Sequence, residues 1–100
     1  MKELTTHLKQ IHELCNAHNV KSLFAFGSVV TDNLKTNSDI DLVVDIEDSD
    51  PLEYTDNYFD LKFQLEAILH RPIDLLENKA IKNPYLRRQI DNTKVLVYGG

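Results

Sequence analysis

The sequence has one cysteine, no tryptophan, three glycines and three prolines among its 100 residues. Because Cys15 stands alone, an internal disulfide and a cysteine-based zinc site are both excluded. No apolar run is long enough to cross a membrane, and the first residues lack the hydrophobic stretch of a signal peptide. We therefore expect a reduced, cytoplasmic protein that does not enter a membrane.

Basic residues are also few, with 11 Lys and Arg against 16 Asp and Glu and a formal net charge of −5. Sequence-independent binding to DNA or RNA depends on clustered lysine and arginine, so this balance argues against nucleic acid as a partner. Nucleotides stay open as ligands, because metal ions can neutralise their phosphates. With 42% hydrophobic residues, the chain is expected to form one domain, residues 1–100, with a modest core.

What the sequence does have is a strand-like run that ends in glycine and serine. The apolar residues Leu23–Phe26 predict a buried strand at residues 22–27. Gly27 allows a sharp turn and lets another molecule approach the backbone closely. Ser28 is then expected to open a short helical turn, whose free N–H groups suit a phosphate.

A second strand, at about residues 39–46, begins with two aspartates, and ten residues (29–38) separate them from Ser28. Side chains two residues apart in a strand point the same way, so Asp39 and Asp41 share one face. Two carboxylates on one face repel each other unless a cation lies between them. Mg²⁺ prefers such oxygen ligands and commonly links carboxylates to substrate phosphates. The pattern predicts a phosphate-binding turn beside a metal-binding acid pair, a combination suited to nucleotidyl transfer.

Helices and strands alternate along the rest of the chain. Hydrophobic spacing and capping residues predict helices at 3–18, 50–69 and 83–91, a loop at 31–37, and strands at 72–76 and 94–98. Phe59 and Phe63 are expected to widen the buried face of the middle helix, and Cys15 to lie in the core. Five polar side chains are instead expected to be solvated: His7, His12, His18, Arg87 and Arg88.

The link between the first two strands is short and not helical, which predicts that they run antiparallel. This pairing brings Gly27 and Ser28 to the same rim of the sheet as Asp39 and Asp41. Asp74, taken alone, reads as a surface acid on an edge strand; if its strand adjoins the second one, it joins the acid pair. The expected fold class is a two-layer α/β (α+β) domain.

The spacing of Gly27-Ser28 and Asp39-Ile40-Asp41 resembles the signature of the DNA polymerase beta-type nucleotidyltransferase superfamily. The length and layout are similar to its smallest members, the minimal nucleotidyltransferases, which include MntA-type antitoxins found beside HEPN toxins. The resemblance extends from the first strand to the final Leu-Val-Tyr. It implies the nucleotidyltransferase fold, with a small mixed sheet packed by helices.

The resemblance also implies a site and a reaction. Asp39, Asp41 and Asp74 would hold two Mg²⁺ ions, with Mn²⁺ as a substitute, and Gly27 and Ser28 would bind the phosphates of ATP. An acceptor hydroxyl would attack the α-phosphate and release pyrophosphate. Since the chain has no room for an acceptor-binding domain, the acceptor is expected to be a partner protein such as a HEPN toxin, modified on a hydroxyl, with tyrosine as the expected residue.

One segment departs from the family pattern, which usually continues Gly-Ser-x-Ala-Arg-Gly. Here Thr31 takes the place of the arginine and Asp32 that of the second glycine. An acid near the phosphate-binding turn is expected to weaken nucleotide binding. Two alternatives therefore stay open: a non-catalytic antitoxin that binds its toxin through a degraded site, and an aminoglycoside-type nucleotidyltransferase whose acceptor pocket forms in a homo-oligomer.

Overall fold

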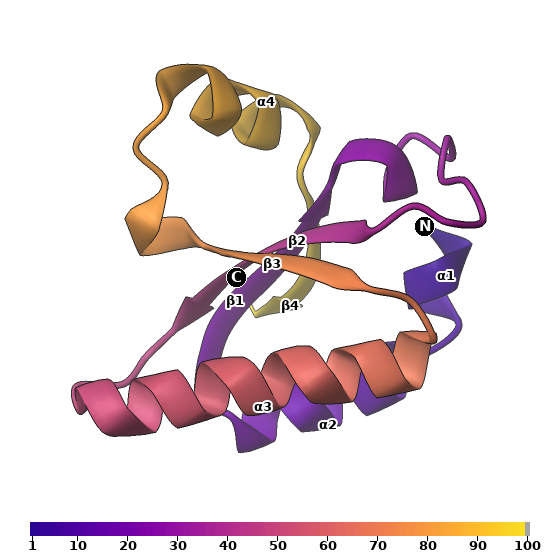
Figure 1. Cartoon of the computed structure of the whole chain (residues 1–100). Helices are drawn as coiled ribbons and strands as arrows, with labels where there is room; N and C mark the ends of the chain where they lie inside the picture. The colour runs from indigo at the N-terminus through magenta and orange to yellow at the C-terminus, as the bar shows by residue number, and fades with distance from the viewer. Residues whose placement is uncertain (100) are drawn as a thin grey trace.

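The computed structural model describes residues 1–99 as a four-stranded sheet with helices on both faces (Figure 1). This is the mixed α/β fold that the sequence predicts. No helix within the described residues combines the length and the apolar character needed to span a membrane. In chain order, the elements are α1 (Lys2–Thr5), α2 (Leu8–Ala17), β1 (Val20–Phe26), the 3₁₀ turn η1 (Gly27–Val29), β2 (Ile40–Ile46), α3 (Pro51–Leu69), β3 (Ile73–Glu77), the 3₁₀ turn η2 (Asn78–Ala80), α4 (Pro84–Thr93) and β4 (Val95–Gly99).

The strands lie in the order β3-β2-β1-β4. β1 runs antiparallel to both β2 and β4, whereas β2 and β3 run parallel. A parallel pair needs a long crossover connection, and α3 supplies it. The predicted antiparallel pairing of the first two strands is confirmed. The strand that carries Asp74 does adjoin the second strand, so the condition for Asp74 to join the acid pair is met, and the sheet is mixed.

Alternating side chains divide the strands between two apolar clusters, one on each face of the sheet. On one face, Leu23 and Leu42 pack with residues of α1, α2 and α3, including the fully buried Leu61 and Leu65. On the other face, a smaller cluster joins β1 and β2 to α4 and consists of Phe26, Val43 and Ile90, with Phe24, Leu76, Ile81 and Leu86 around them. Three helices therefore cover one face, and α4 covers part of the other.

Two helices begin as their capping residues predict. Asp50 accepts a hydrogen bond from the backbone N–H of Leu52 at 2.9 Å, and Asn83 accepts from those of Tyr85 and Leu86 at 2.9 and 3.3 Å. In both helices a proline follows the cap, where the missing N–H costs no intrahelical bond. These caps fix where α3 and α4 start.

The prediction of one continuous helix at residues 3–18 is wrong. Thr6 and His7 separate α1 from α2, and His7 has a non-helical backbone with φ −117° and ψ 19°. The first turn instead buries Leu4 completely and bonds the Met1 amino group to the Val29 carbonyl oxygen at 2.6 Å. Here tertiary contacts override the local helical pattern.

The prediction that Phe59 and Phe63 widen the buried face of α3 is also wrong, because both rings are exposed. Leu61, Leu65 and Leu69 form the buried stripe at a spacing of four residues. Each phenylalanine precedes one of these leucines by two residues, which is about 200° around a helix. The rings therefore point away from the sheet.

Several side chains expected to be solvated are bonded instead, among them His12, whose Nε2 lies 2.7 Å from the Val97 carbonyl oxygen. His18 is buried at the end of α2, with Nδ1 2.7 Å from the Leu14 carbonyl oxygen and Nε2 2.5 Å from Asp60 Oδ2. Arg87 donates to the side-chain and backbone oxygens of Asn78, both at 2.8 Å. Cys15 lies in the core as predicted, and burial raises the pKa of its thiol to about 12.

Candidate active site

Gly27 lies at the end of β1, directly beside Asp41 of β2. The antiparallel register pairs Phe26 with Asp41, so the next residue turns past the aspartate side chain. Gly27 has a φ of +76°, which L side chains rarely adopt, and a Cβ placed there would come within 2.8 Å of Asp41 Oδ2. The glycine thus permits both the turn and the close approach of the carboxylate to the backbone.

Asp41 and Asp74 are direct neighbours across the parallel pair β2–β3. Asp39 precedes β2 by one residue, at the same end of the strand. Asp41 is half-buried, and Asp39 and Asp74 are exposed. The pKa of the Asp41 carboxyl is raised, first by burial and then by the negative charges of Asp74 and Asp39. The structure therefore brings the three predicted acids to one rim, where they interact electrostatically.

These acids fit a divalent cation by their chemistry rather than by a complete preformed cage. Within residues 1–99, no three acidic, histidine or cysteine side chains converge closely enough to hold one ion. The donors are nevertheless hard carboxylate oxygens from two neighbouring strands, and their mutual repulsion is what an opposite charge offsets. A metal ion at this rim would have to draw the three carboxylates together.

The predicted helical turn after Gly27 is present as η1. Val29 is 1% exposed and anchors the turn in the core, while Ser28 is half-buried at the rim. The Gly27 carbonyl oxygen accepts from the N–H groups of Val30 and Thr31 at 3.1 and 3.3 Å, which closes the turn. The first N–H groups of such a turn have no acceptor within it, so they are suited to bind an anion.

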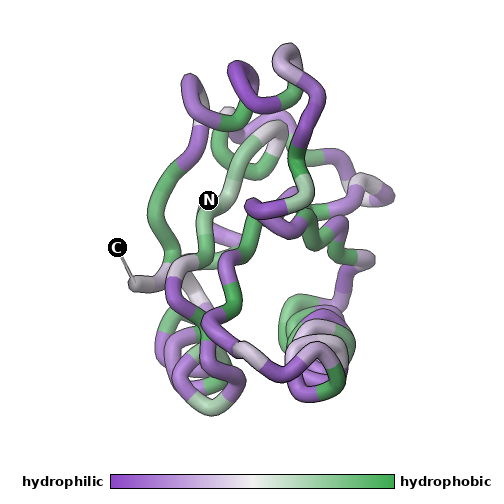
Figure 2. Tube along the Cα trace, turned by 90° about the vertical axis from the view of Figure 1, so that its left-hand side faces the viewer, coloured by the Kyte–Doolittle hydropathy of each residue, from purple (hydrophilic) through white to green (hydrophobic). Residues whose placement is uncertain are grey.

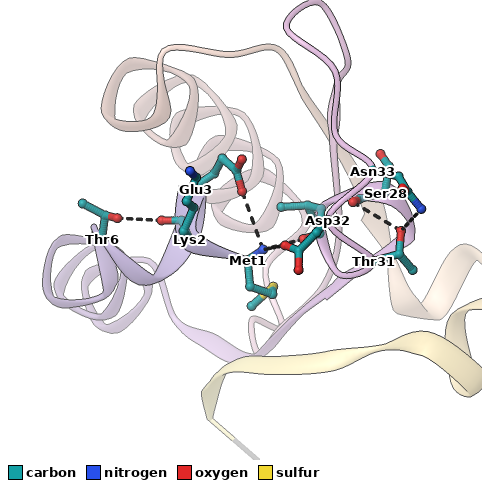
Figure 3. A network of polar contacts seen from close by, with 9 residues as sticks. Met1, Lys2, Glu3, Thr6, Ser28, Thr31, Asp32 and Asn33 are labelled. Atoms are coloured by element: carbon teal, nitrogen blue, oxygen red, sulfur yellow. Dashed lines mark hydrogen bonds and ion pairs between the residues drawn. The ribbon is translucent and has the colours of Figure 1, made fainter.

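Asp32 occupies a position where the backbone favours glycine. Its φ is +59°, in the left-handed region that aspartate tolerates better than most residues. Its carboxylate is 3.0 Å from the Met1 amino group, and the Thr31 hydroxyl donates to the Ser28 carbonyl oxygen at 3.4 Å (Figure 3). Solvent screens this ion pair, because the Asp32 side chain is 82% exposed, and the weakening of nucleotide binding by Asp32 stays a prediction.

Arg71 is a supporting residue that sequence reasoning missed. Its guanidinium donates to the carbonyl oxygens of Lys35, Thr36 and Ser38 at 2.8, 3.2 and 3.2 Å. These carbonyls belong to the loop that leads into Asp39, so the arginine, which stands just before β3, fixes this loop next to that strand. A single arginine before a proline carries no sequence signal for this role.

A cavity of about 80 Å³ lies on the acid-bearing face of the sheet, beneath α4. Lys94 Nζ lies 4.8 Å from the centre of the Phe24 ring, and Arg87 is held by Asn78. Sequence reasoning missed this cavity because its walls come from four separate elements and the segment between α4 and β4. The lining residues are Ser22, Phe24, Val43, Asn78, Arg87, Ile90 and Lys94.

Comparison with known proteins identifies the family of this chain. The family described as "Polymerase beta, Nucleotidyltransferase" matches residues 9–100. A candidate protein adenylyltransferase of Methanocaldococcus jannaschii is 32% identical over 97 residues, which are 97% of this chain and 94% of the relative. The protein adenylyltransferase MntA of Thermococcus cleftensis is 32% identical over 80 residues, 80% of this chain and 75% of the relative.

Solved structures share the fold. A protein described as a minimal nucleotidyltransferase superposes with a TM-score of 0.76 and 27% identity, covering 92% of this chain and 90% of that one. A chain from a complex described as tri-AMPylated Shewanella oneidensis HEPN toxin with MNT antitoxin superposes with a TM-score of 0.65 and 19% identity, covering 97% of this chain and 73% of that one. At 19% identity, the second likeness shows a shared fold alone.

Proposed function

Because this chain belongs to the polymerase beta-type nucleotidyltransferase family, we propose that it transfers AMP from ATP to a hydroxyl group of a partner protein. The observation that carries the proposal is the meeting of Gly27, Asp41 and Asp74 at one rim of the sheet. The names of the relatives, protein adenylyltransferases, support a protein as the acceptor.

Each residue at the rim has a distinct part in this proposal. The N–H groups of Gly27 and Ser28 bind the outer phosphates, and the serine hydroxyl adds one hydrogen bond. Asp39, Asp41 and Asp74 would hold Mg²⁺, which neutralises the triphosphate and lowers the pKa of the acceptor hydroxyl. The acceptor oxygen then forms a bond to the α-phosphorus as the bond to pyrophosphate breaks. The protein contributes mainly position and charge.

The acceptor is proposed to approach from the β3 edge of the sheet. β3 is the outermost strand on this side, and Asp74 is exposed on it. The net charge of −5 disfavours a nucleic acid as the acceptor. A complex of an AMPylated HEPN toxin with an MNT antitoxin is among the structural neighbours. It supports a HEPN-type toxin as the partner and an antitoxin role for this chain.

The transfer is tested by mixing the protein, Mg²⁺ and labelled ATP with the product of the gene adjacent to its own. Label is expected on a hydroxyl-bearing residue of the partner, with tyrosine as the predicted one, and it should disappear with Asp39→Ala/Asp41→Ala. The matched control is Glu13→Ala, which removes an exposed acid on α2 and should leave labelling unchanged.

A second function is favoured by one observation, the replacement of the family arginine by Thr31. This second function is that of a binding module, which neutralises its partner by contact alone and transfers no AMP. The same experiment separates the two functions, because a binding module neutralises the partner equally well with both aspartates removed and transfers no label. That outcome would replace the transferase proposal.

A further inference from the structure

α3 carries an exposed apolar stripe on its outer side. Leu52, Phe59 and Phe63 are 77%, 49% and 62% exposed. Their spacing of seven and four residues places them on one face of the helix. The rings of Phe59 and Phe63 stack, with their centroids 6.4 Å apart. These three residues are called the α3 stripe below. Contiguous exposed apolar surface is where soluble proteins commonly bind partners.

The fold itself does not explain the α3 stripe. Leu61, Leu65 and Leu69 already pack α3 against the sheet, on the opposite side of the helix. Figure 2 views α2 and α3 nearly end-on beneath the sheet, and hydrophobic colour recurs around α3 rather than on its inner side alone. Within residues 1–99, three of the six exposed large hydrophobic side chains belong to this one helix face.

The surroundings of the α3 stripe are acidic. α3 contains four acids, Glu53, Asp56, Asp60 and Glu66, and a single basic residue, Lys62, which is half-buried. Glu53 and Asp56 are exposed next to the stripe. The negative charges of Asp48 and Asp50, in that order, raise the pKa of Glu53. The stripe is therefore bordered by a region of negative potential near the start of the helix.

We propose that the α3 stripe docks an amphipathic helix from a partner protein, with lysine or arginine residues along the edges of its apolar side. From Leu52 to Phe63 the stripe extends about 16 Å, the length of three helical turns. The lysines or arginines would face Glu53 and Asp56. Apolar contact along the stripe provides the binding energy, and charge complementarity selects the partner.

The charges also exclude other occupants. In a second copy of this chain, α3 would bring the same exposed acids, Glu53 and Asp56, to a surface that is already acidic, and the only lysine of α3 is half-buried. The net charge of −5 adds to this repulsion, and it likewise opposes an anionic lipid surface. A basic helix is the occupant that matches both the apolar stripe and its border.

The α3 stripe lies apart from the candidate active site. α3 packs on the sheet face opposite to Phe26, Val43 and the acids. A helix bound there leaves the rim at Gly27 and Asp41 open. Docking at the α3 stripe does not rest on the proposed transfer reaction. Peptide binding tests the stripe, and ATP binding tests the rim separately.

The test uses synthetic peptides of about 18 residues, or five helical turns. One peptide carries leucines at helical spacing flanked by lysines, a second has glutamates in place of the lysines, and a third has the lysine composition in scrambled order. Fluorescence anisotropy with the full chain should show the first peptide binding at least about tenfold more tightly than the other two. Phe59→Ser/Phe63→Ser and Glu53→Lys/Asp56→Lys should each weaken that binding about tenfold. The matched control is Tyr85→Ser, which removes an exposed aromatic ring from α4.

Circular dichroism and urea unfolding confirm that each variant is folded. Equal binding of the ordered and scrambled lysine peptides would overturn the proposal, because it would show attraction by net charge alone. Unchanged binding by Phe59→Ser/Phe63→Ser would also overturn it. Sedimentation velocity should show a monomer; a concentration-dependent dimer that Phe63→Ser abolishes would assign the stripe to a second copy instead.

Discussion

The two faces of the sheet differ in what they contain and in how fully they are covered. One face is mainly apolar, and three helices cover it, with Leu23, Leu42 and Leu65 all at 0% exposure. The other face carries Asp41 and Asp74 beside a smaller apolar cluster, and α4 covers only part of it. The first face stabilises the fold, and the stability it provides allows the second to keep repelling carboxylates together.

A substitution in the core of the helix-covered face should give the largest loss of stability. Leu65→Ala removes a fully buried side chain between α3 and the sheet, and we expect it to lower the free energy of unfolding by about 2–5 kcal/mol. Urea unfolding followed by circular dichroism measures this change. Phe63→Ala, two residues away on the exposed side, is the matched control and should change stability by no more than about 0.5 kcal/mol. Equal losses in the two variants would contradict the burial pattern of α3.

A smaller loss is expected from Gly27→Ala on the acid-bearing face. The alanine must adopt the left-handed backbone region, which costs about 1–2 kcal/mol, and its Cβ meets Asp41 Oδ2. ATP affinity should fall as well, since the turn and the carboxylate both shift. The measurements are urea unfolding and calorimetric titration with ATP and Mg²⁺.

A double-mutant cycle separates the two causes. In an Asp41→Ala background the carboxylate is gone and only the backbone cost remains, so Gly27→Ala should cost less there than in the wild-type chain. If the two costs are equal, the contact between Gly27 and Asp41 is not part of the effect.

The smallest effect on stability is expected from pH, through the raised pKa of Asp41 on the acid-bearing face. The folded protein raises the pKa of Asp41 above its ordinary value of 3.8, so it retains this proton to higher pH than the unfolded chain does. The contribution of Asp41 to stability is therefore greatest at low pH and falls as the pH rises from 3.8 towards the raised value. Asp41→Asn removes this fall, and its stability relative to wild type should increase across that window.

Urea unfolding at a series of pH values from about 3 to 7 measures the difference between the two proteins. Leu65→Ala serves as the control, because its deficit should be independent of pH. A constant difference between Asp41→Asn and wild type would show that folding does not raise the pKa of Asp41.

The parts of the fold that depend on neighbouring residues could be predicted from the sequence. Asp50 and Asn83, each followed by proline, mark the starts of α3 and α4. The short link after Gly27 predicts an antiparallel pair and hence the meeting of the glycine with Asp41. In each case the signal and the structure it specifies lie within a few residues or one loop.

The parts that depend on distant contacts could not be predicted. Arg71 bonds to carbonyls 33 to 36 residues away, and His18 reaches Asp60 across 42 residues. Phe59 and Phe63 were misassigned because apolar residues occur all around α3, so spacing alone does not say which stripe meets the sheet. The roles of the three acids in metal binding and transfer stay predictions.

The parallel pairing of β2 and β3 also affects the order in which the site forms. Asp41 and its neighbour Asp74 are separated by the whole of α3, so their pairing closes a long loop and carries the entropy cost of doing so. A ribosome that has released the chain only through β2 has exposed the glycine turn and two of the three acids. The third arrives after α3 has formed and β3 has added to the sheet edge. Completion of the acid cluster therefore requires that the loop through α3 has closed, and a fragment ending before residue 73 would lack the third acid.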